Sequence, residues 1–129
     1  RLDLTLDNVE VRATFALSWN LLDERHRRTF RLLAPFGGRR FGVEAYCAVA
    51  EEEQWDGLDR LDLLVSLSLL GADGTRAYRQ HALLADFASE KLVAAGDATE
   101  AKTRLVNYTL SFAEQHQQDY EALQLERGD

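Results

Sequence analysis

The 129-residue chain is poor in several residue types, and each shortage excludes a class of protein. A single cysteine, Cys47, excludes an internal disulfide framework and any metal site built from several cysteines. No apolar run approaches the roughly 20 residues that a membrane-spanning helix needs. No basic segment followed by an apolar one opens the chain, as a secretory signal would. We therefore expect a cytoplasmic protein that does not associate with membranes.

Methionine is absent and the chain starts at Arg1, so we expect a piece excised from a longer protein. Proline occurs once, hydrophobic residues make up 46% and charged residues 29%, which is the composition of a folded domain and not of a disordered tail. A chain of this length buries enough apolar surface to form one hydrophobic core without the support of disulfides or metal ions.

The charge is strongly acidic, with a formal net charge of −7. Because nucleic-acid affinity comes largely from neutralising phosphates, DNA binding starts at a disadvantage. The charges are also segregated along the chain. A basic stretch comes first and consists of Arg25, His26, Arg27, Arg28, Arg31, Arg39 and Arg40, and an acidic stretch follows with Glu44, Glu51, Glu52, Glu53, Asp56, Asp59 and Asp62. Two interpretations stay open: two solvated faces, or a polarised interface with a neighbouring domain, for which Arg27, Arg28, Arg31, Arg39 and Arg40 are the candidates.

Hydrophobic periodicity predicts a mainly α-helical fold. An extended lead-in over residues 1–7 precedes helices over about 9–22, 24–34, 43–50, 55–70, 81–95 and 99–125. Asn8 and Asp23 are the expected N-caps, and Gly96 is the expected C-cap of the fifth helix. We expect the first helix to be mostly buried. One apolar face consists of Val9, Ala13, Ala16 and Leu17. The apolar stripe is widened by Val11, Phe15, Trp19 and Leu22.

A β-hairpin is predicted between the fourth and fifth helices. The turn signal is residues 71–74 (GADG), and the flanking residues 68–70 and 75–80 are the expected strands. Helices followed by a hairpin are the plan of a winged helix-turn-helix, which we expect over residues 1–96. Residues 97–129 are then a helical extension, either a linker or the first helix of a repeat array.

No catalytic motif occurs in the chain. The glycine-rich run at residues 35–42 lacks the lysine-serine or lysine-threonine ending of a phosphate loop, so it predicts a turn. The histidines His26, His81 and His116 lie far apart in sequence, which disfavours a metal site. Cys47 lies among apolar residues and is expected to be an inert thiol. We therefore expect no enzymatic activity and no cofactor bound by this chain alone.

Four segments in order resemble one known family. They are residues 11–22 (VRATFALSWNLL), 28–38 (RTFRLLAPFGG), 61–70 (LDLLVSLSLL) and 78–88 (YRQHALLADFA). Together they are similar to the winged-helix domain of signal-transducing ATPases of the NB-ARC type, over roughly residues 8–96. In that family a phosphate-loop ATPase domain precedes the winged helix, and a helical repeat array or propeller often follows it.

The resemblance implies a regulatory role that is not catalytic. The winged helix of such proteins packs on the ATPase domain, holds its ADP-bound resting state and moves when ATP with Mg²⁺ replaces ADP, after which the proteins often assemble. The histidine of the family's methionine-histidine-aspartate motif reaches the ADP phosphates. Gln80, His81 and Ala82 occupy that motif here, so the histidine alone matches. The implied partners are the upstream ATPase domain and a downstream sensor of the same polypeptide.

Three alternatives remain beside this interpretation. His81 can be an ordinary helix-start residue with no ligand. The chain can be a DNA-binding winged helix that reads DNA with residues 55–70, although Asp56, Asp59 and Asp62 have the wrong sign for a phosphate-lined groove. It can also be a helical scaffold with no switch role, in which case changing His81 has no consequence.

Overall fold

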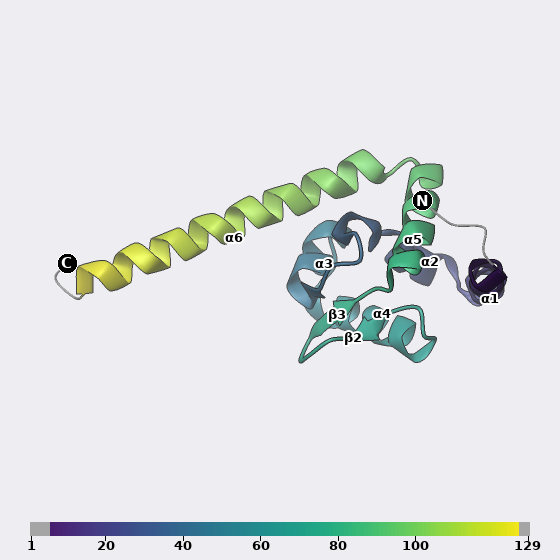
Figure 1. The fold of residues 1–129 in the computed structure, drawn as a ribbon. Coiled ribbons are helices and arrows are strands. Elements are labelled where there is room, and N and C mark those ends of the chain that lie inside the picture. The colour runs from purple at the N-terminus through teal and green to yellow at the C-terminus, as the bar shows by residue number, and fades with distance from the viewer. Residues whose placement is uncertain (1–5, 127–129) are drawn as a thin grey trace.

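The part of the chain that the structure describes contains seven helical segments and three short strands. The computed structural model describes residues 6–126 and shows a mainly helical fold with one small antiparallel sheet and a long C-terminal helix (Figure 1). The elements in chain order are α1 (Leu6–Leu21), α2 (Glu24–Arg31), the 3₁₀ helix η1 (Ala34–Phe36), β1 (Phe41–Gly42), α3 (Val43–Ala50), α4 (Gln54–Ser66), β2 (Gly71–Ala72), β3 (Ala77–Arg79), α5 (Ala82–Ala95) and α6 (Ala98–Glu126).

Capping residues fix several helix ends where the sequence predicts them. The Asp23 carboxylate accepts the backbone N–H of His26 at 2.9 Å and starts α2. Gly96 ends α5 in the left-handed conformation, with φ of 80°. The predicted boundaries of α3 are confirmed at both ends. Pro35 lies in η1, which closes the α2 segment three residues after Arg31.

The expectations for α1 are wrong in two respects. The helix begins at Leu6, so Asn8 lies inside it and is not its N-cap, and the predicted lead-in falls partly on residues 1–5, which lie outside the described residues. The face expected to be buried is exposed, with Val9 51% and Leu17 69% accessible. The adjacent stripe of Phe15 and Trp19 packs inward instead, because aromatic side chains bury more area than Val and Ala.

The sheet is small and its strands differ from the predicted ones. Its order is β1-β3-β2, with Phe41 opposite Tyr78 and Ala72 also opposite Tyr78 on the other side. The predicted hairpin exists, but β2 occupies residues assigned to the turn, which shifts the turn to residues 73–76. The strand β1 was not anticipated.

The fourth helix ends four residues earlier than predicted. It ends at Ser66 with Leu67 as its C-cap, and Ser68 then takes a positive φ of 63°. The backbone N–H of Leu69 bonds back to Leu64 at 2.9 Å, which closes the end of the helix. Leu69 and Leu70 are therefore buried loop residues and not strand residues.

One core joins α2, α3, α4 and α5 and extends to the base of α6. Its fully buried side chains include Phe30, Tyr46, Leu61 and Phe87. Ala101 of α6 is also fully buried, and the Arg104 side chain donates to the backbone carbonyl of Val49 at 2.6 Å. The rest of α6 runs away from the body to the C-terminal end (Figure 1).

Within residues 6–126, no helix has the length and apolar character needed to cross a membrane.

Candidate functional site

His81 is the N-cap of α5 and lies at the junction between the sheet and that helix. Its Nδ1 accepts the backbone N–H of Leu83 at 3.1 Å, and its own carbonyl accepts the N–H of Ala85 at 2.9 Å. A ring whose Nδ1 is an acceptor carries its proton on Nε2 in the neutral state. The side chain is exposed, so the Nε2–H of His81 can donate to a ligand.

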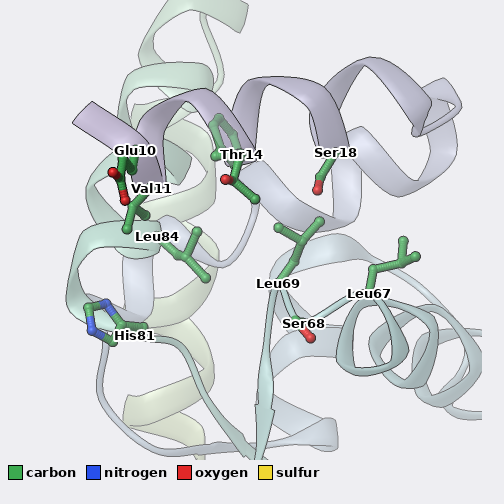
Figure 2. Close-up of a pocket in the computed structure, with 10 residues that line it drawn as sticks. Glu10, Val11, Thr14, Ser18, Leu67, Ser68, Leu69, His81 and Leu84 are labelled. Atoms are coloured by element: carbon green, nitrogen blue, oxygen red, sulfur yellow. The ribbon is translucent and has the colours of Figure 1, made fainter. Parts of the chain in front are cut away.

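A groove of about 600 Å³ opens beside His81. Its walls come from α1, from the loop between α4 and β2, and from the start of α5 (Figure 2). Apolar side chains form most of its surface, and they are Val11, Phe15, Leu67, Leu69 and Leu84. The polar residues of the lining are Glu10, Thr14, Ser18, Ser68 and His81. Phe15 and Arg12 of α1 contact Phe87 and Glu90 of α5, whereas Glu10, Val11, Thr14 and Ser18 line the groove beside the loop.

The chemistry of the groove suits an apolar group with hydrogen bonds at the rim. The lining contains the carboxylate of Glu10 and the imidazole of His81, and it includes neither lysine nor arginine. A diphosphate needs several donors or cations around its oxygens. In the groove lining, His81 is the one side chain that can be cationic and can donate through a ring N–H.

Four of the five arginines proposed for inter-domain contacts bond within the chain, three of them around α2. Arg27 Nε donates to the carbonyl of Trp19 at 3.1 Å, and its guanidinium lies 5.2 Å from the centre of the Trp19 ring. Arg28 bonds to the carbonyl of Ala50 at 2.9 Å. Arg31 pairs with the Glu24 carboxylate at 2.6 Å, and its own side chain is 13% exposed. These guanidiniums stabilise the fold around α2.

Arg39 and Arg40 directly precede β1, which pairs with strand β3 of the hairpin. Arg40 Nε donates to the carbonyl of Asp73 at 2.9 Å, and Arg79 pairs with the Asp73 carboxylate at 3.1 Å. Arg39 and Arg76 are exposed and form no ion pair among residues 6–126. Asp73 thus offsets the charge of Arg40 and Arg79, and Arg39 and Arg76 keep exposed guanidiniums.

The basic and acidic stretches are joined at Glu52, a connection that sequence reasoning missed. Glu52 Oε2 lies 3.1 Å from Arg28 and 2.5 Å from Arg60, and the Glu52 side chain is only 8% exposed. The nearby Tyr46 hydroxyl donates to Thr29 at 2.9 Å. The signal was present in the arginine-rich segment and the glutamate-rich segment that follows it. Arg28 and Glu52 are nevertheless 24 residues apart, and their pairing depends on the packing of α2 against α3 and α4.

Cys47 lies in a setting that disfavours reactivity. Partial burial, together with the carboxylates of Glu52, Glu44 and Glu53, raises the pKa of the Cys47 thiol to about 11. Since the thiolate is the nucleophile, the thiol has little reactivity at neutral pH. No group of three or more His, Cys, Asp or Glu side chains within the described range is arranged to hold a metal ion.

Comparison of the chain with models of protein families, with curated proteins and with solved structures finds no match.

Proposed function

We propose that this chain is a regulatory module of a larger NB-ARC-type signalling ATPase, in which it packs on an upstream nucleotide-binding domain and stabilises the ADP-bound resting state. The resemblance of residues 8–96 to the winged-helix domain of that family is the starting point. The proposal makes the chain a non-catalytic partner of ADP, or of ATP with Mg²⁺, which the upstream domain holds.

The arrangement of the elements supports a winged helix-turn-helix. Helices α3 and α4 are joined by only three residues, 51–53, where Glu51 has a left-handed φ of 57°. A short link of this kind is typical of a helix-turn-helix. In this interpretation β2 and β3 form the wing, β1 pairs with its inner strand, and α6 is the link to a downstream sensor.

The position of His81 is the observation that carries the functional proposal. A histidine that caps α5 through Nδ1 has its Nε2–H pointing away from its own helix and available to an external acceptor. The first turn of α5 also has backbone N–H groups that favour an anion nearby. If the His81 Nε2–H bonds to an ADP phosphate in only one of two domain arrangements, that bond shifts the equilibrium toward this arrangement.

The test compares His81 variants of the full-length parent. His81→Ala removes both the cap and the ring, whereas His81→Ser restores a short capping hydroxyl that cannot reach a ligand. A hydrogen bond to a charged phosphate is worth roughly 1.5–3 kcal/mol, so we expect both variants to bind ADP about 10- to 100-fold more weakly. The measurements are ADP released from the purified protein, by chromatography, and the assembled fraction, by light scattering.

A matched control is His116→Ala, which removes a histidine from the distant part of α6. We expect it to retain ADP like the wild type. Unchanged ADP retention in both His81 variants, with no spontaneous assembly, would contradict the proposal and favour a helical scaffold. Micromolar binding of ADP to the isolated chain, measured by calorimetry, would also contradict it, because one histidine cannot replace a phosphate loop.

DNA binding is the weaker alternative. The exposed side chains of α4 include Asp56, Asp59 and Asp62, which would face the phosphates of a major groove. Arg76 and Arg79 of the hairpin are the basic residues available to oppose them. Salt-dependent binding to duplex DNA that is lost in Arg76→Ala and Arg79→Ala would favour this alternative.

A further inference from the structure

The second half of α6 carries an apolar stripe that faces solvent. Phe112, His116, Tyr120 and Leu123 follow one another at spacings of four, four and three residues, which places them within about 80° of one another on a helix. The side chains of Phe112, Tyr120 and Leu123 are 54–60% exposed. We call these four residues the distal stripe. Figure 1 shows no other element beside this half of the helix.

The distal stripe continues a face with which α6 already packs on the body. Ala101, Leu105 and Tyr108 precede Phe112 on the same face, at spacings of four, three and four residues. Ala101 is fully buried, Leu105 packs against the core, and the Tyr108 ring stacks on Phe112 with 6.1 Å between ring centroids. The stripe is therefore the extension of an established interface beyond the edge of the domain.

The distal half of α6 lacks the tertiary packing that normally stabilises a helix in water. Its side chains bond within the helix, where Gln115 donates to Asp119 and Gln117 donates to Glu121. The His116 ring lies 4.2 Å from that of Phe112. Such pairs support helicity but leave the apolar stripe exposed, so a partner that covers it would stabilise this half of α6.

The charge of the segment indicates what kind of partner fits. Between residues 105 and 125 the charged side chains are Glu114, Asp119 and Glu121, and the segment contains neither lysine nor arginine. Asp119 borders the distal stripe, about 20° from Phe112 around the helix. A second copy docked side by side through the stripe would bring Asp119 against Asp119, because the basic residues Lys102 and Arg104 lie at the base of α6 and Arg104 is bonded to the body of the domain.

We propose that the distal stripe docks an amphipathic helix whose apolar seam is flanked by lysine or arginine. The seam covers Phe112, Tyr120 and Leu123, and a basic residue at its edge pairs with Asp119. The proposal rests on α6 alone and does not depend on the role of His81, so each can fail without the other.

The test uses two synthetic amphipathic helical peptides with the same leucine seam. One carries lysine and the other glutamate at the positions that flank the seam, and fluorescence anisotropy reports binding of each labelled peptide to the whole chain. We expect the lysine peptide to bind about three- to fivefold more tightly than the glutamate peptide, because Asp119 attracts the lysine and repels the glutamate by about 0.5 kcal/mol each, a difference of about 1 kcal/mol.

Matched substitutions locate the binding surface. Leu123→Ala is expected to weaken the lysine peptide about tenfold, whereas Leu125→Ala, on the opposite side of α6, leaves its affinity within twofold. Asp119→Lys is likewise expected to weaken binding more than Glu114→Lys, which makes the same charge change away from the stripe. Equal binding of both peptides, or equal effects of the two leucine substitutions, would overturn the proposal.

Two further measurements exclude other occupants. Sedimentation of the chain alone tests self-association through the stripe, and flotation with phosphatidylcholine vesicles tests a lipid surface. We expect a monomer and no flotation. Self-association that Leu123→Ala abolishes, or vesicle binding that it abolishes, would assign the stripe to a second copy or to a bilayer and refute the basic helix.

Discussion

Replacing Gly57 with alanine tests how closely α3 and α4 approach each other. A Cβ atom on Gly57 would lie 2.4 Å from Cys47 Sγ and 3.4 Å from the Tyr46 ring. Gly57 is buried in the interior of α4, where alanine would otherwise stabilise the helix by roughly 0.5–1 kcal/mol. The overlap with sulfur instead forces side chains out of their preferred positions, at a cost of roughly 1–3 kcal/mol.

We therefore expect Gly57→Ala to lower the free energy of unfolding by about 1–2 kcal/mol. Removing the sulfur makes room for the added methyl group. In a Cys47→Ala background the same Gly57 substitution should be neutral or stabilising, which corresponds to a coupling energy of about 2 kcal/mol between the two positions.

Urea unfolding of the wild type, both single variants and the double variant supplies the four free energies, with circular dichroism as the probe. The expected loss in Gly57→Ala shifts the midpoint by about 1 M urea. A Gly57→Ala variant as stable as the wild type, or a coupling energy below about 0.5 kcal/mol, would refute the close approach of the helices.

Two further predictions concern the polar groups beneath α2. Glu52→Gln leaves the Arg28 and Arg60 guanidiniums without their shared carboxylate, so we expect the free energy of unfolding in urea to fall by about 3 kcal/mol. Glu51→Gln changes the exposed neighbouring carboxylate and should lower it by less than about 0.5 kcal/mol. Similar losses in both variants would contradict the shared ion pair. Burial raises the pKa of Tyr46 above its ordinary value of 10.0, so its contribution to stability is complete below about pH 10 and is lost as pH rises further. The urea midpoint should fall as the pH rises above 10, less steeply in Tyr46→Phe than in the wild type. An equal slope in that variant would contradict the assignment.

Local signals predicted the helices that have clear caps. Asp23 and Gly96 act through hydrogen bonds and backbone conformations that depend on a few neighbouring residues, so the sequence specifies them directly. The hairpin was also anticipated, but its register was not. Strand β1 is two residues long, and it forms because Phe41 meets Tyr78, a pairing that no local pattern encodes.

Which face of α1 is buried could not be read from periodicity, because apolar residues occur on both sides of the helix. The face with Val9 and Leu17 satisfies the pattern of an amphipathic helix as well as the face with Phe15 does. The choice is made by partners far along the chain. Phe15 stacks on Phe87 with 4.5 Å between ring centroids, and Arg12 pairs with Glu90.

The sequence predicts the part of the candidate site that depends on local chemistry but not the part that depends on tertiary packing. His81 was identified at the start of α5, where its role as a cap follows from local chemistry. The groove beside it combines α1 with the loop after α4, so it depends on tertiary packing. The sequence pattern assigns Leu67 to a longer helix and Leu69 to a strand, so it does not predict that both line the groove.

The length of α6 gives it a mechanical property. Its 29 residues span about 43 Å at 1.5 Å per residue. The buried Ala101 and the bond from Arg104 to Val49 clamp its base to the body. A rotation of the body by about 10° would therefore sweep the far end of a stiff α6 through about 7 Å, with the helix acting as a lever arm. A modest rearrangement near the sheet would reach a distant partner as a displacement larger than the width of a side chain.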